Sequence, residues 1–459
     1  MPLILPSAAL LMILAQSPPA DASAKLEAGS TKPEDGSRKQ EAGSGKPEAG
    51  SQKPKPKKDP KPKPEKTYPV FELGDDHPEL QLGKGSKIEF RARFAGDYTD
   101  SEASAAESGE TSDIDLGKKR IGISGEIKNA FEYQIEAELD DDDPWRDVYG
   151  DFKYFPFARV RGGQFKVPFS LDENTGASRL DFMFRSLAAT HLAPGRDRGV
   201  MVHGRVVKEK LRYEAGVFEH DGKNARTNNP DKVFGDQTIA VRVSAEPFRN
   251  TKDAVGDLSV GVAFAHSDVP EGIPGLRGQT VLGQNFFSSS DYIVSGPRKR
   301  LGVEMEFLPG PATIKAEWMR VDTERRGQSV EETDLSPLIG EGWYVSGTYT
   351  ITGEKKSRVQ RPKKPLFQGG FGGVEVGARI ESLRFRSGAS GEEGSSGPRA
   401  DVILGNRNQV ATFGVNWYIN RFFKIQANFI REKLDDPSQG PLPSKGSFNS
   451  KAIRFQFSM

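Results

Sequence analysis

The stretch KIEFRARF, Lys87–Phe94, alternates charged and apolar residues at all eight positions. Successive side chains of a β-strand point to opposite faces, so this pattern predicts a strand with one apolar and one charged face. Two media suit such a strand. A soluble sheet would turn the apolar face to a protein core, whereas a transmembrane barrel would turn it to lipid and its charges to a wet lumen. Features elsewhere in the sequence distinguish a soluble sheet from a transmembrane barrel.

The composition excludes several classes of protein. Lys and Arg total 65 and Asp and Glu total 64, so the formal net charge of +1 gives no reason to expect a nucleic-acid partner. The absence of cysteine excludes disulfides, thiolate metal sites and a cysteine nucleophile. The five histidines lack metalloenzyme spacing, and no nucleotide-binding or serine-hydrolase motif occurs. We therefore expect neither an enzyme nor a bound cofactor or metal.

Residues 1–24 read as a secretory signal peptide. The apolar run Leu3–Ala15 is too short to span a bilayer as a helix, and Ala22–Ala24 offers a small-residue cleavage site. A retained, buried helix is the alternative. A removed signal would place the mature protein in the cell envelope.

Residues 25–70 form a low-complexity linker. Seven-residue units such as EAGSGKP recur from Glu27, and a Lys/Pro-rich run follows up to Lys66. The repeat units carry no large apolar side chain that could build a core, so we expect a disordered N-terminal extension. It is either a solvated spacer or a cationic tether, residues 25–66, to the anionic cell-wall polymer.

Residues 71–459 carry the ordered part of the chain. Two-residue alternation recurs there without a convincing amphipathic helix, and most candidate strands have the eight to twelve residues that a tilted membrane strand needs. We expect sixteen strands, beginning near residues 86, 118, 131, 147, 158, 199, 211, 236, 258, 299, 312, 342, 374, 409, 423 and 451.

The connections between these strands alternate in length. Tight turns such as LPGP, Leu308–Pro311, alternate with long polar links such as Ser170–Arg198, although the links 247–257 and 352–373 are long on the short side. Short turns at one end and long loops at the other are typical of outer-membrane barrels. The sequence therefore predicts an all-β, transmembrane antiparallel β-barrel of about sixteen strands in the outer membrane of a Gram-negative-type bacterium, with its apolar faces against lipid.

Several segments resemble the phosphate-selective porin O and P family. They are RIGISGEIKNAF (Arg120–Phe131), YGDFKYFPFARVRGGQFKVPFSLD (Tyr149–Asp172) and FMFRSLAATHLAPGRDRGVMVHG (Phe182–Gly204). The resemblance covers about residues 71–459. It implies a sixteen-stranded barrel, a homotrimer, and a third long loop that folds into the pore as a constriction.

The resemblance also implies that basic side chains line the route of small anionic solutes. Carried over by position, five of them lie in or beside the third long link: Lys166, Arg179, Arg185, Arg196 and Arg198. Four on predicted strands would face inward: Arg91, Arg93, Arg120 and Arg242.

The link Ser170–Arg198 carries four arginines but also four carboxylates. Phosphate binding favours several guanidinium groups that no carboxylate opposes. The sequence thus leaves open whether the pore selects phosphate, weakly prefers anions or is general. We expect an outer-membrane porin for passive diffusion of small solutes, with anions such as phosphate favoured. The alternative is a structural protein that tethers the outer membrane to the cell wall.

Overall fold

The computed structural model describes residues 68–74, 77–103, 112–139, 141–222, 237–249, 257–270, 276–288, 292–356, 360–388 and 394–459. The expected signal peptide lies outside these residues. So does the expected linker, apart from its last three residues. None of the helices in the described ranges is long and apolar enough to cross a membrane.

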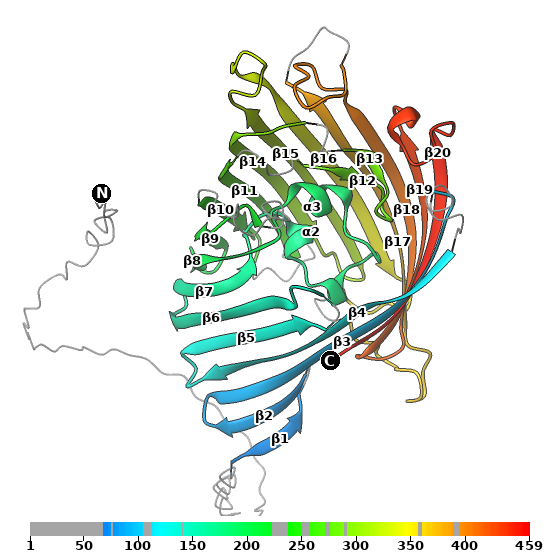
Figure 1. Cartoon of the computed structure of the whole chain (residues 1–459). Helices are drawn as coiled ribbons and strands as arrows, with labels where there is room; N and C mark the ends of the chain where they lie inside the picture. The colour runs from blue at the N-terminus through cyan, green and yellow to red at the C-terminus, as the bar shows by residue number, and fades with distance from the viewer. Residues whose placement is uncertain are drawn as a thin grey trace, which may run out of the picture. The chain divides into compact units, whose positions relative to one another are not determined.

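Within the described residues, sixteen antiparallel strands close into a barrel, as the sequence predicts (Figure 1). Each strand pairs with the next along the chain, and the last pairs with the first, with Ser458 opposite Arg93. The strands are β3 (Ser86–Ser101), β4 (Ser112–Ile127), β5 (Phe131–Glu138), β6 (Trp145–Phe155), β7 (Ala158–Lys166), β8 (Arg196–Val206), β9 (Leu211–Phe218), β10 (Thr238–Ala245), β11 (Leu258–Val269), β14 (Gly296–Phe307), β15 (Ala312–Arg325), β16 (Leu335–Thr350), β17 (Gly373–Ser387), β18 (Asn406–Tyr418), β19 (Phe423–Leu434) and β20 (Ser447–Ser458).

A short hairpin precedes the barrel. Its strands β1 (Val70–Leu73) and β2 (Pro78–Gly83) pair with each other, and β2 pairs with the first residues of β3, with Glu79 opposite Glu89. The sequence pattern does not predict this hairpin, since β1 and β2 have only four and six residues and β2 begins at a proline. It covers the part of the β3 edge that β20 does not reach.

The sixteen predicted strands all correspond to observed ones, but several begin earlier than expected. β4 begins at residue 112 and β16 at residue 335, inside links that the sequence suggested were loops. The ladders continue there because neighbouring strands extend equally far, with Asp100 opposite Ser112. Polar composition alone therefore does not mark where these strands end.

The tight connections lie at one end of the barrel. Lys128 and Asn129 join β4 to β5 with φ angles of 50° and 56°, the left-handed conformation that a short hairpin turn requires. The two long links that the sequence places on the short-turn side are also long in the structure, at residues 246–257 and 351–372. The opposite end carries the long connections, including β12 (Gly278–Gln279), β13 (Asn285–Phe287) and η6 (Pro437–Gln439).

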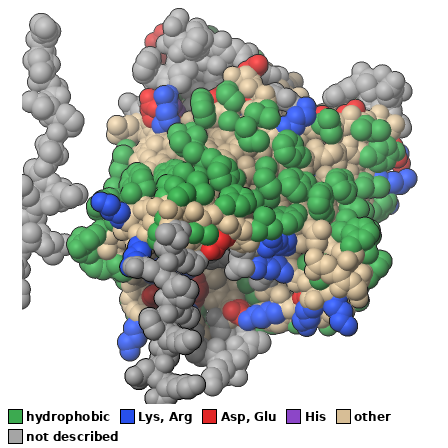
Figure 2. All heavy atoms as spheres, turned by 90° about the horizontal axis from the view of Figure 1, so that it is seen from below, with side chains coloured by type: hydrophobic (Ala, Val, Ile, Leu, Met, Phe, Trp, Pro, Cys, Tyr) green, Lys and Arg blue, Asp and Glu red, His purple; other side chains and the backbone are tan. Residues whose placement is uncertain are grey.

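The stretch KIEFRARF forms part of β3, with one apolar and one charged face, as the sequence predicts. Phe90 and Phe94 are exposed on the outside of β3, whereas Arg93 between them is buried on the lumenal side. The same alternation runs around the barrel, and Figure 2 shows the resulting hydrophobic band, with Lys and Arg mostly at its margins. The apolar face of the strand therefore meets lipid.

Residues 167–195, here called the constriction loop, join β7 to β8 and fold inside the barrel (Figure 1). The loop contains α2 (Leu171–Asn174), η1 (Ala177–Arg179) and α3 (Leu187–Leu192). α3 packs against β15, β16 and β17. A Cβ on Gly342 of β16 would lie 2.8 Å from the Cβ of Ala188, so this approach needs glycine in the wall. The apolar core lies between the loop and this wall.

Candidate functional site in the barrel lumen

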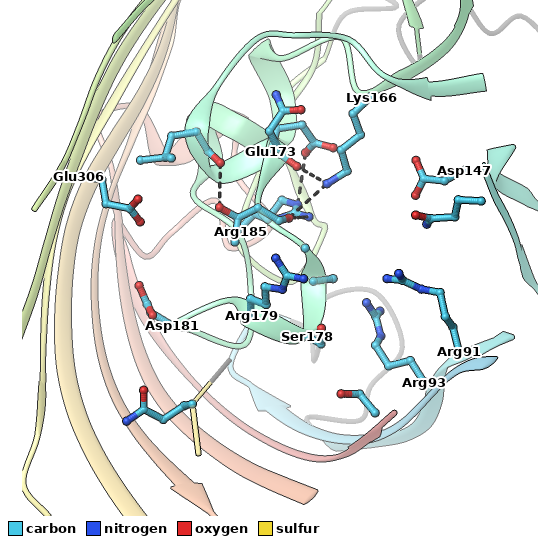
Figure 3. A pocket seen from close by; sticks show the side chains of 18 of the residues that line it. Arg91, Arg93, Asp147, Lys166, Glu173, Ser178, Arg179, Asp181, Arg185 and Glu306 are labelled. Carbon is cyan, nitrogen blue, oxygen red and sulfur yellow. Dashed lines mark hydrogen bonds and ion pairs between the residues drawn. The ribbon is translucent and has the colours of Figure 1, made fainter. Parts of the chain in front are cut away.

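A polar cavity of about 920 Å³ occupies the lumen beside the constriction loop. Its lining comes from η1 and neighbouring loop residues on one side and from inward-facing side chains of the barrel wall on the other (Figure 3). The barrel thus leaves room for small solutes, and the loop narrows that room. What the site can do depends on the charges along both sides.

Buried carboxylates of the wall hold the constriction loop by its backbone. Glu317 of β15 accepts the amides of Leu171 and Asp172 at 2.6 and 2.9 Å. Glu381 of β17 accepts the amide of Leu187 at 2.6 Å, at the beginning of α3. These bonds satisfy amides at the start of each helical turn, which would otherwise be buried without a partner.

The middle of the loop is held between two further strands. Asn428 of β19 accepts the amide of Met183 at 2.8 Å, and Arg454 of β20 donates to the Met183 carbonyl at 2.9 Å. Lys424 donates to the carbonyls of Ser178 and Leu180 at 3.1 and 3.2 Å. The loop is therefore fixed along its length rather than at its ends alone.

A buried acidic residue anchors the loop to a connection from the opposite end of the barrel. Asp181 lies 2.8 Å from Lys315 of β15 and 2.8 Å from Lys356, which also pairs with Glu375. Burial alone would raise the pKa of the Asp181 carboxyl, but Lys315 and Lys356 outweigh burial and hold it well below its usual range. Lys356 belongs to the long connection 351–372, which also brings Gln360 to the cavity. The sequence shows the unusual length of this connection but does not indicate that Lys356 and Gln360 reach the lumen.

The end of α3 is held by a second buried ion cluster. Asp221, which follows β9, binds Arg298 at 2.5 Å and Arg300 at 2.8 Å, and both guanidinium groups are fully buried. Arg300 also donates to the carbonyl of Leu192 at 2.9 Å. Burial alone would raise the pKa of Asp221, but Arg300 and Arg298 outweigh it and lower the pKa to about 2.

Eight of the nine site residues predicted from the sequence line the cavity. They are Lys166, Arg179, Arg185, Arg196, Arg91, Arg93, Arg120 and Arg242. Arg198 lies elsewhere, which corrects its expected place in the pore. Its side chain is 64% exposed, shares the outward face of β8 with Val200 and Val202, and pairs with Glu219 at 2.8 Å.

The basic residues in and beside the constriction loop are largely engaged with protein groups. Arg185 lies 3.3 Å from Glu173, and Arg196 lies 2.7 Å from Asp147 of β6. Lys166 donates to the carbonyls of Glu173 and Thr175. These contacts hold the loop in place and reduce the positive charge it presents to a solute.

The cations without such partners lie on the opposite wall. Arg91 and Arg93 of β3 and Lys118 of β4, together called the wall cluster, have no carboxylate within 4.0 Å among the described residues. Within the described part of the chain, the buried Nε atoms of Arg91 and Arg93 have no hydrogen-bond acceptor. In Figure 3 both side chains point from β3 across the cavity towards Arg179 of the constriction loop.

The two other predicted wall arginines are neutralised. Arg120 binds Glu138 at 2.9 Å and Glu136 at 3.5 Å. Arg242 lies between Glu214 and Glu304, at 3.0 and 2.5 Å. Lys118 was missed from the sequence, although its spacing from Arg120 places both on one face of β4. Among the described residues, no group of three His, Asp or Glu side chains could hold a metal ion.

The family model for "Phosphate-selective porin O and P" matches residues 88–459. Porin O of Pseudomonas aeruginosa is 23% identical over 408 residues, which cover 81% of this chain and 87% of that protein. Among solved structures, the trimer form of OmpT from Vibrio cholerae is 12% identical, covers 82% of this chain and 100% of that chain, and has a TM-score of 0.52. An anion-selective porin from Comamonas acidovorans is also 12% identical, with the same coverage and a TM-score of 0.51.

The structural likenesses show the same barrel fold at low identity. The family match spans β3 to β20 almost completely, from residue 88 to the last residue of the chain. The chain therefore belongs to the phosphate-selective porin O and P family and is a porin of the outer membrane.

Proposed function

We propose that this porin passes small solutes by passive diffusion, that it favours anions such as phosphate, and that the wall cluster supplies the preference. The observation that carries the proposal is that three lumenal cations, Arg91, Arg93 and Lys118, have neither an ion pair nor a side-chain hydrogen bond among the described residues. No bond is made or broken in this process, so the lumen needs charge and shape rather than catalytic groups.

A selective pore must attract an anion strongly enough to admit it and weakly enough to let it leave. A guanidinium group with free N–H donors replaces part of the water shell of an anion, and two such groups on one strand offer several donors to phosphate. The lumen is open to water, which weakens each attraction enough for the solute to leave. The constriction loop, held by Glu317 and Glu381, sets the width at that position.

The relatives agree with this assignment. The family description names phosphate selectivity, and the Comamonas acidovorans structure is described as an anion-selective porin. The OmpT structure from Vibrio cholerae is described as a trimer, and we propose a homotrimer in the lipid of the outer membrane for this chain also.

Reversal potentials in planar bilayers test the proposal. The full chain is measured under a KCl gradient and then under a potassium phosphate gradient, alongside the triple variant Arg91→Gln, Arg93→Gln, Lys118→Gln. Wild-type protein should prefer anions. The variant should lose about fivefold or more of the anion-to-cation permeability ratio, because one unit charge in a wet pore attracts an anion by about 1 kcal/mol.

The matched control removes an ion pair without changing the net charge of the lumen. Asp147→Asn with Arg196→Gln eliminates a pair whose atoms lie 2.7 Å apart. Its permeability ratio should stay near the wild-type value. A triple variant that keeps the wild-type ratio would refute the role of the wall cluster, and a cation-preferring wild type would refute the proposed selectivity.

The alternative function, a tether to the cell wall, depends on residues 25–66. These residues lie outside the part of the chain that the structure describes, and neither the family description nor the two solved structures named above concern a tether. The barrel alone gives no reason to prefer it.

A further inference from the structure

We propose that the outer wall over β17, β18 and β19 binds the phosphate groups of a phosphorylated lipid in the outer leaflet. The binding groups are Arg384 of β17 and Arg431 and Lys433 of β19, here called the outer basic patch. The three strands are hydrogen-bonded neighbours on one side of the barrel (Figure 1). This site is separate from the lumen and from the proposed route of the solutes.

The orientation of the patch follows from the residues beside it. Phe385 is fully buried next to Arg384, and Ile430 and Glu432 are buried next to Arg431 and Lys433. Because alternate side chains of a strand face opposite sides, the three exposed cations point away from the lumen.

The patch lies at the margin of the apolar band, towards the long-loop end. Along β17, Arg384 follows Ile380, which is 55% exposed, and along β19, Arg431 follows the exposed Phe429. Between them on β18, Phe413 is 61% exposed. A lipid lying against this wall would place its acyl chains on the apolar residues and its headgroup on the cations.

Two other outward-facing cations on β17 and β18 have a carboxylate partner. Arg407 lies 2.8 Å from Asp435, and Arg386 lies 3.4 Å from Glu341. Within the described ranges, Arg384, Arg431 and Lys433 have neither an ion pair nor a side-chain hydrogen bond.

The strand register adds to the positive charge of the patch. Arg384 stands directly opposite Arg407, a like-charge arrangement that is unfavourable without a nearby anion. Lys433 is paired in register with the neutral Gln409. Asp435 neutralises Arg407, which leaves Arg384 and the two β19 cations to attract an anion.

A phosphorylated lipid headgroup fits these observations better than a free anion. The planar guanidinium groups match phosphate oxygens in a bidentate manner, and basic residues at an anionic leaflet are attracted to it. Inorganic phosphate would use the cations but not the exposed Ile380 and Phe413. The apolar residues beside the patch therefore commit the site to a lipid.

The test uses the full chain in detergent with diphosphoryl lipid A as the probe and native mass spectrometry as the readout. The variant Arg384→Gln, Arg431→Gln, Lys433→Gln should bind the probe about tenfold more weakly or worse. The control Arg198→Gln, Lys299→Gln, Lys451→Gln removes the same charge from outward positions that are paired at 2.8, 3.7 and 3.8 Å. It should bind nearly as well as wild type.

Each other result overturns the proposal. Equal loss in both variants would indicate a general effect of charge, and no loss in either would exclude the patch. Equal binding of phosphatidylethanolamine, or full displacement of the probe by inorganic phosphate, would exclude specific recognition of a phosphorylated lipid. A changed oligomer mass without a change in lipid binding would make the face an interface between copies. The reversal potential of the patch variant should match wild type, which keeps this test independent of the proposed anion selectivity.

Discussion

Arg93 of β3 and Arg120 of β4 lie directly opposite each other in the barrel wall, and only Arg120 is bound by carboxylates. Two like charges in register repel each other. Glu138 and Glu136 offset that repulsion for Arg120, whereas Arg93 keeps its charge for the lumen. The two arginines thus have the same residue type but opposite roles in stability.

Substituting each of them should separate these roles. Arg93→Gln removes a repulsion, so the unfolding midpoint in urea should stay the same or rise. Arg120→Gln leaves the buried Glu138 without its guanidinium and should cost about 1–3 kcal/mol. Urea titration of the detergent-solubilised barrel, followed by tryptophan fluorescence, measures both. Equal destabilisation by the two substitutions would contradict the difference in their pairing.

Arg198 gives a prediction about position. Because its side chain faces outward and pairs with Glu219, Arg198→Glu should leave the anion-to-cation permeability ratio unchanged. Arg91→Glu reverses a charge inside the lumen and should lower the ratio by about tenfold or more. Reversal potentials of the two variants under one KCl gradient compare them directly. A clear effect of Arg198→Glu would place this residue on the solute route after all.

Met183 gives a prediction about the rigidity of the constriction loop. Asn428→Ala with Arg454→Gln leaves the backbone N–H and C=O of Met183 without their wall partners, at a cost of about 1–3 kcal/mol for each buried group. We expect higher current noise and a larger mean conductance in single-channel recordings.

A conservative variant is the control for this loop experiment. Asn428→Asp keeps an oxygen that accepts the Met183 amide at the same position, so its current noise should stay near wild type. If the double variant were as quiet as the wild-type channel, the Met183 contacts would not hold the loop.

Asp221 gives a prediction about acid stability. Its pKa of about 2 lies below the value of about 3.9 expected for an unfolded chain, so the folded state favours the ionised carboxylate. The stabilisation, about 2.6 kcal/mol, is present above pH 4 and is lost as the pH falls through about 2.

Urea midpoints between pH 5 and pH 2 test this expectation. Wild-type protein should lose stability across the window, whereas Asp221→Asn should start about 3–5 kcal/mol lower, since Arg298 and Arg300 then stay buried without a counter-ion. The variant should also lack the Asp221 contribution to the slope. An identical pH dependence of the two proteins would assign the acid sensitivity to other carboxylates.

The barrel was predictable from the sequence because its evidence is periodic. Alternation such as that in KIEFRARF depends only on the strand, and lipid enforces it on every outward face. The same alternation places Arg198 on the outward face of β8, with Val200 and Val202. It places Lys118 on the lumenal face of β4, with Arg120. Following the alternation rather than the nearest loop would have placed both residues.

The contacts that complete the site follow no such period. Lys356 and Gln360 of the connection 351–372 line the cavity, where Lys356 pairs with Asp181, and no periodic pattern in the local sequence indicates these positions. Likewise, the sequence shows four arginines and four carboxylates in the link Ser170–Arg198 but not their partners. Arg185 pairs with Glu173, and Arg196 pairs with Asp147. Because these arginines are neutralised, the cations that remain unpaired among the described residues of the lumen are those of β3 and β4.

The fixed constriction loop has a consequence for redesign of the channel. Its aperture depends on backbone bonds to Glu317, Glu381 and Asn428, while the unpaired charge belongs to two strands across the lumen. Width and ionic preference are therefore specified by different parts of the chain. Substituting the lumenal side chains of β3 and β4 should therefore change the ion selectivity of the channel without changing the width of its constriction.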